Sequence, residues 1–133
     1  MNDTTFGSVI SRYTRAQAIA DGVLVDVSSI AREAGFHYPV ALSAAAWSDS
    51  VAWSDADSHR QTIQDEPGRL WDLLWTASLA AQRARGQRRI ACQAYRVPRG
   101  GRGTRPRLTT LHLHIGPGDA GEPVITVLMP GED

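Results

Sequence analysis

The spacing of apolar residues changes near residue 86, from a helical repeat before it to strand-like alternation after it. The clearest helix spans residues 67–85, with Asp65 as its N-cap, Pro67 in its first turn and Gly86 as its stop. Its apolar residues recur every three and four positions and form one stripe, made of Leu70, Leu73, Leu74, Ala77, Ala81 and Ala84.

Three strands follow this helix, at residues 90–97, 107–115 and 123–129. A Gly/Arg-rich loop at 98–106 and a turn at 116–121 join them, and such short connections predict an antiparallel meander. The second strand has one apolar and one polar face. The third is apolar on most of both faces, which predicts a central or covered position.

The N-terminal half predicts shorter elements. Residues 1–8 are expected to be disordered, residues 23–27 to form a strand that joins the sheet, and residues 54–65 to form a polar loop. Short helices are expected from a cap at Thr14 to a stop at Gly22, from Ser28 or Ser29 to Ala34, and from a cap at Ser43 to Val51. The prediction is one α+β domain over residues 1–133, an antiparallel sheet with a C-terminal three-strand meander, one long helix packed on it and short N-terminal helices.

Composition narrows the class of protein. The chain has 133 residues, of which 42% are hydrophobic, which is enough for one core. Its single cysteine, Cys92, excludes a disulfide within the chain and a Cys-rich zinc site. No apolar run approaches the ~20 residues of a bilayer span, and no signal peptide is recognised. We therefore expect a cytoplasmic protein with no membrane partner and no cofactor.

Charge is distributed unevenly although the formal net charge is zero. Residues 83–107 contain nine arginines and no acid. Such a block either faces an acidic partner or is balanced by the acids of its own domain. Its candidate binding residues are Arg83, Arg85, Arg88, Arg89, Arg99, Arg102 and Arg105. Arg99, Arg102 and Arg105 are the stronger candidates, because a glycine-rich loop adapts to a partner and arginine offers a bidentate fork.

A His-x-His pair on the second strand, His112 and His114, is the best candidate for chemistry. Alternate residues of a strand point the same way, so the two imidazoles suit metal binding or acid/base chemistry. A third ligand is absent from the local sequence, and Asp119, Asp26 or His37 would have to supply it in space. Solvent-facing histidines on the polar side of the strand are the simpler interpretation.

The remaining candidates favour ordinary structural roles. The cluster of Asp49, Asp55, Asp57 and His59 lacks EF-hand spacing and is expected to be a solvated loop with capping aspartates. Cys92 is expected to be a buried, inert thiol. The glycines at 100–103 open no helix and so do not form a phosphate loop. Half of the tryptophans (Trp47, Trp53, Trp71 and Trp75) are expected in the core, and a half-exposed one would mark a binding surface.

Several segments resemble an uncharacterised bacterial domain family, at residues 13–27, 31–36, 68–75, 113–119, 121–126 and 130–133. This family of unknown function resembles the cargo of plasmids, phages and other mobile elements. The resemblance implies a mobile-element setting and supplies no catalytic residue. By analogy, small accessory proteins from such settings often antagonise host defence.

Two classes of function follow. The first is a non-enzymatic binding protein whose arginines dock on a host protein or nucleoprotein, as a counter-defence inhibitor. The second is a small enzyme that uses His112, His114 and a carboxylate. Direct binding of nucleic acid through the same arginines is a third reading. We favour the first, because no catalytic triad, metal motif or cofactor loop is complete.

Overall fold

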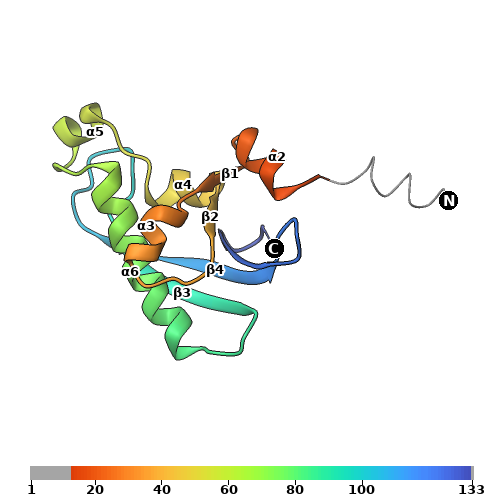
Figure 1. Cartoon of the computed structure of the whole chain (residues 1–133). Coiled ribbons are helices and arrows are strands. Elements are labelled where there is room, and N and C mark those ends of the chain that lie inside the picture. Colours follow the sequence, from red (N-terminus) through yellow and green to blue (C-terminus); the bar gives the residue numbers. More distant parts are fainter. Residues whose placement is uncertain (1–12, 133) are drawn as a thin grey trace.

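The computed structural model describes residues 13–132. The predicted disordered segment 1–8 therefore lies outside the described residues. The chain forms a five-stranded sheet in the order β1-β2-β5-β4-β3 (Figure 1). Its strands are β1 (Leu24–Asp26), β2 (Val40–Ser43), β3 (Arg89–Arg96), β4 (Arg107–Pro117) and β5 (Pro123–Leu128).

The three C-terminal strands form the predicted antiparallel meander, and β5 lies at the centre of the sheet as its apolar faces indicate. The strand predicted at 23–27 also joins the sheet, as β1. The prediction of a wholly antiparallel sheet is wrong, because β2 pairs with β5 in parallel. The long stretch of helices and strands between β2 and β5 lets the chain re-enter the sheet in the same direction.

Helix α6 (Glu66–Arg83) covers one face of the sheet, as Figure 1 shows. Asp65 caps it by accepting a hydrogen bond from the Gly68 amide at 2.7 Å. Its apolar stripe packs in one core with the inward residues of β3 and β4, as predicted; that core includes Leu70, Leu73, Leu74, Ala77, Ile90, Cys92, Leu111 and Leu113. Among residues 13–132, no helix is both long and apolar enough to cross a bilayer.

The short predicted helices are present as α2 (Arg15–Ala20), α3 (Ser28–Glu33) and α4 (Ala44–Ser50). A further helix, α5 (Asp55–Arg60), lies inside the segment that was predicted to be a polar loop. Ser54 and Asp57 explain this helix, because they form a reciprocal capping box that satisfies its first amides. The segment 54–65 is therefore partly helical.

Candidate binding surface

The predicted arginines lie in two groups at opposite ends of β3. The helix-end patch consists of Arg83, Arg85, Arg88 and Arg89, where α6 ends and β3 begins. The loop patch consists of Arg99, Arg102 and Arg105, in the β3–β4 connection. Figure 1 shows the two connections at opposite ends of the hairpin. The structure therefore does not gather the seven arginines into one patch.

Six arginines of residues 83–107 are exposed and have no carboxylate within ion-pairing distance among residues 13–132; they are Arg83, Arg85, Arg88, Arg102, Arg105 and Arg107. An acidic partner could therefore bind these side chains without breaking any ion pair within residues 13–132. Most of the block is thus not balanced by acids within residues 13–132.

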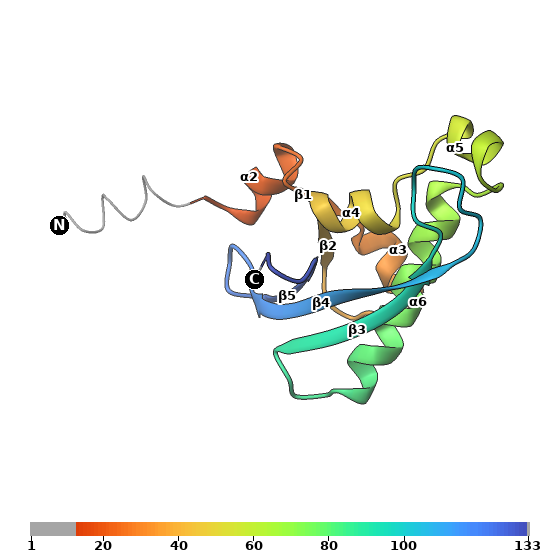
Figure 2. The ribbon, with the colours of Figure 1, turned by 180° about the vertical axis from the view of Figure 1, so that it is seen from behind.

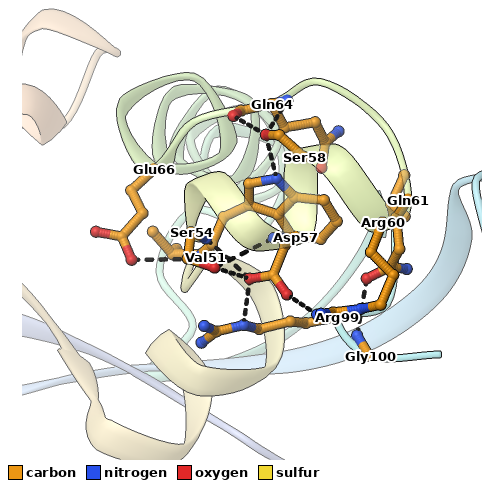
Figure 3. Close-up of polar contacts among 12 residues, drawn as sticks. Val51, Ser54, Asp57, Ser58, Arg60, Gln61, Gln64, Glu66, Arg99 and Gly100 are labelled. Carbon is orange, nitrogen blue, oxygen red and sulfur yellow. Dashed lines mark hydrogen bonds and ion pairs between the residues drawn. The ribbon is translucent and has the colours of Figure 1, made fainter. Parts of the chain in front are cut away.

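Arg99 differs from its neighbours in the loop patch. Its Nε donates to Oδ2 of Asp57 at 2.7 Å, and Asp57 is only 1% exposed. Arg60, from the last turn of α5, forms a second ion pair with the same carboxylate (Figure 3). Arg99 therefore supports the fold, whereas Arg102 and Arg105 extend into solvent.

The β3–β4 loop is anchored on α5. The Gln61 amide accepts a hydrogen bond from the Gly100 amide at 2.9 Å and donates to the carbonyls of Pro98 and Gly103 at 2.9 and 2.7 Å. Figure 3 shows Gln61 and Gly100 beside the Asp57–Arg99 pair. These hydrogen bonds fix the loop, and with it the arginines, against the end of α5. The glycines of the loop had predicted an adaptable tip instead.

Asp57 is held as a carboxylate at the centre of this network. Burial raises the pKa of its carboxyl, but hydrogen bonds from Ser54 and the ion pair with Arg99 outweigh burial and bring the pKa below its ordinary value. Ser54 donates to it from both its amide and its hydroxyl, at 2.8 and 2.9 Å. The group joins α5 to the β3–β4 loop.

A second buried cation, Arg69 of α6, lies next to this network. Its guanidinium carbon is 4.5 Å from the centre of the Trp53 ring, and it donates to the carbonyls of Val51 and Val97 at 3.0 and 2.9 Å and to Gln64. Burial, reinforced by nearby Arg96, lowers the pKa of Arg69. Its Nη2 is buried with no hydrogen-bond partner among the described residues, a situation that usually costs about 1–3 kcal/mol.

A groove of about 520 Å³ runs between α6 and β3. Arg69 and Arg96 line it together with one acid, Asp72, and Arg96 is paired with Asp49 at 3.0 Å. Two aromatic side chains border it, Trp75 at 50% exposure and Tyr95 at 70%. The lining thus combines two aromatic residues with two arginines, of which Arg96 is paired, and one acid.

The four tryptophans divide between core and surface, as expected. Trp53 is buried and Trp47 packs partly buried against the core. Trp71 and Trp75 stack on the outside of α6 with their ring centres 6.1 Å apart. Trp75 of this half-exposed pair lines the groove, and a half-exposed tryptophan is the feature expected of a binding surface.

His112 and His114 lie half-buried on the face of β4 opposite to its core residues. His114 lines a shallow pocket of about 290 Å³ with Arg15, Arg89 and Thr126, and no carboxylate is among the residues that line it. No group of three His, Cys, Asp or Glu residues able to hold a metal is found within residues 13–132.

The proposed third ligands have other roles. Asp119 accepts hydrogen bonds from the amides of Arg15 and Ala16, at the start of α2. Asp26 accepts from the amide and hydroxyl of Ser28, at the start of α3. His37 is exposed and lines a different pocket from that of His114.

The acidic cluster of Asp49, Asp55, Asp57 and His59 is not one solvated loop. Asp49 accepts hydrogen bonds from Arg96, Thr109 and Ser50. These contacts outweigh burial, which acts in the opposite direction, and lower the pKa of Asp49. Asp57 is buried, and only Asp55 and His59 remain together on α5.

Cys92 is buried, and burial raises the pKa of its thiol, which agrees with an inert side chain.

Sequence reasoning missed the buried role of Asp57 and the anchoring role of Gln61. A signal for the first was present, because Ser54 and Asp57 have the three-residue spacing of a capping box. No comparable signal marks Gln61 or the position of Arg69, since their partners are backbone carbonyls distant in the sequence.

Comparison with protein families places the chain in a family of unknown function (DUF6573), whose model matches residues 1–133. The chain belongs to this family. No match is found among curated proteins or among solved structures.

Proposed function

We propose that this member of the family is a non-enzymatic binding protein that docks on an acidic partner through its arginine-rich surface. The observation that carries the proposal is the set of six exposed arginines at 83–107 with no carboxylate in reach among residues 13–132. Arginine is enriched at interface hot spots and recognises carboxylates bidentately.

The partner in this proposal is a host protein or nucleoprotein complex, and the setting is a plasmid, phage or other mobile element. The setting rests on the family resemblance, and counter-defence inhibition is the activity that small accessory proteins from such settings often have. Trp75, which lines the groove, and Trp71, which stacks on it, are half-exposed and add apolar contact area, which supports a protein surface over a purely ionic one.

Direct binding of nucleic acid is the second candidate, because the same exposed arginines would neutralise phosphates. The enzymatic alternative with His112 and His114 gains no comparable support, since the pocket at His114 is lined by arginines without a carboxylate.

The test is affinity capture from bacterial lysate by the full chain, in parallel with three variants. One replaces Arg83, Arg85 and Arg88 with alanine, a second replaces Arg102 and Arg105, and a control replaces Arg32, an exposed arginine of α3. We expect a specific partner that is lost or weakened at least tenfold by one or both patch variants and kept by the Arg32→Ala control.

Nuclease treatment before capture separates the two candidates. A partner that survives nuclease is a protein, and one that disappears with it is nucleic acid or depends on it. Equal capture by the wild type and both patch variants would contradict the proposal.

A further inference from the structure

We infer that the outer edge of β3 accepts an acidic, extended segment of a partner protein as an additional strand of the sheet. The inference rests on the proposed function and names the structural mode of that docking.

β3 is the last strand of the sheet, and within residues 13–132 no strand pairs with its outer edge (Figure 2). The carbonyl of Arg88 accepts a hydrogen bond from the amide of Ile115, so this pair is a hydrogen-bonded pair of the antiparallel ladder. Alternation then directs the amides and carbonyls of Ile90, Cys92 and Ala94 to β4, and those of Ala91, Gln93 and Tyr95 outward.

The edge lacks the usual devices against strand addition. β3 contains no proline or glycine, and its register with β4 is continuous from Arg89 to Arg96, without a bulge. Its middle residues are uncharged, so charge is confined to the two ends. Such an edge is a template for an added strand.

The groove between α6 and β3 lies where one face of an added strand would project. Side chains on that face would meet Trp75, Thr76 and Arg69, and those on the other face would lie beside Gln93 and Tyr95. Strand addition takes affinity from the backbone and specificity from pockets for alternate side chains, which is the arrangement here.

The charges around the outer edge of β3 determine which kind of segment binds there. Arginines flank the edge at both ends, and residues 83–107 contain no acid; the single acid that lines the groove is Asp72. A second copy pairing antiparallel through β3 would place the exposed Arg88 of one copy near the β3–β4 loop of the other, which carries the exposed Arg102 and Arg105, and this would occur twice. That like-charge arrangement disfavours self-association and favours an acidic segment from another protein.

The backbone chemistry favours a peptide over nucleic acid. The outward groups of Ala91, Gln93 and Tyr95 alternate donors with acceptors, and a peptide strand supplies both kinds in return. Phosphate oxygens only accept, so they would leave the three outward carbonyls without partners.

The test is selection of a randomised dodecapeptide library, displayed on yeast, against the full chain. We expect enrichment of acidic sequences with alternating β-branched or aromatic residues. Binding of the selected peptides should fall at least tenfold with Gln93→Pro and stay within threefold of wild type with Gln93→Ala. Proline at this position removes an outward amide and leaves the hydrogen bonds to β4 intact.

Circular dichroism checks that the variants fold. Two substitutions of opposite charge at Ala91 give a second test that does not depend on proline. Ala91→Glu should weaken binding of the selected peptides and Ala91→Lys should strengthen or preserve it, since Ala91 is exposed on the edge strand. Failure to enrich acidic peptides, or peptides insensitive to both Gln93→Pro and the Ala91 pair, would overturn the inference.

Three further outcomes show which of the two proposals has failed. If a labelled 20-base-pair duplex binds more tightly than any selected peptide and ignores Gln93→Pro, the arginines serve nucleic acid and the inference is wrong. If the arginine variants no longer capture the partner from lysate but Gln93→Pro still does, the proposed function is supported and binding by strand addition is wrong. If neither set of variants changes capture, both fall.

Discussion

The arginines of residues 83–107 have different physical roles, although they are the same type of residue. Arg99 neutralises the buried Asp57, Arg96 pairs with Asp49, and Arg102 carries no ion pair among the described residues. Removing one partner of a buried charge leaves the other uncompensated, whereas truncating an exposed side chain changes little. The same substitution therefore separates structural arginines from candidate contact residues.

We predict that Arg99→Ala lowers the free energy of unfolding several-fold more than Arg102→Ala, which should stay within about 0.5 kcal/mol of wild type. Both positions lie in the same loop, so Arg102→Ala controls for loop disturbance. Urea unfolding followed by circular dichroism measures both. Equal effects of the two variants would show that the Asp57–Arg99 pair contributes nothing specific.

The low pKa of Asp57 has a consequence for stability against pH. A carboxyl whose pKa is lower in the folded state than in the unfolded chain contributes stability that is present above the unfolded pKa. That contribution is lost as the pH falls below about 4, toward the folded pKa. We predict that wild-type unfolding free energy falls over this window and that Asp57→Asn flattens the slope. Parallel curves from urea titrations at stepped pH would refute this.

At the scale of elements, the apolar stripe of α6 was readable because a helical repeat needs only local sequence. Leu74 is fully buried, and Leu79 on the same helix is 38% exposed. We predict that Leu74→Ala costs about 2–5 kcal/mol of unfolding free energy and Leu79→Ala less than about 1 kcal/mol. Chemical denaturation measures the difference. A change below about 0.5 kcal/mol for Leu74→Ala would contradict the core assignment.

Elements whose signals are local were predicted, and those decided by distant partners were not. The predicted capping residues Thr14, Ser43 and Asp65 are confirmed, since each accepts a hydrogen bond from the amide three residues later. The loop at 98–106 was located by its glycines, but its attachment to Gln61 depends on a residue about forty positions earlier. The sequence therefore predicts which elements carry the candidate arginines. It does not predict which of these arginines form structural contacts within the fold.

At the scale of the whole molecule, the order of strands was the least predictable feature. The parallel pairing of Val40–Leu42 with Ile125–Val127 joins segments more than eighty residues apart, and no local pattern encodes it. The apolar faces of β5 indicated a central place, but not which strand would be its second neighbour. The central strand of the sheet is the last of the described strands in sequence order.

This topology makes cooperative folding depend on the C-terminal strand. β5 supplies the buried Ile125 and Val127 and is the only link in the described sheet between the β1–β2 pair and the β3–β4 hairpin. We predict that a chain ending at Glu122 shows no cooperative urea transition, because core residues such as Leu42 and Leu113 lose their shared neighbour strand. A chain ending at Met129 is the control.

The control chain keeps β5 but loses Glu132, which accepts hydrogen bonds from Ser43 and the Met129 amide. It should therefore unfold cooperatively at a somewhat lower urea concentration than the full chain, since each lost hydrogen bond contributes about 0.5–1.5 kcal/mol. Circular dichroism and tryptophan fluorescence measure both truncations. A cooperative transition in the chain ending at Glu122 would mean that the β3–β4 hairpin and α6 form a folding unit without the central strand.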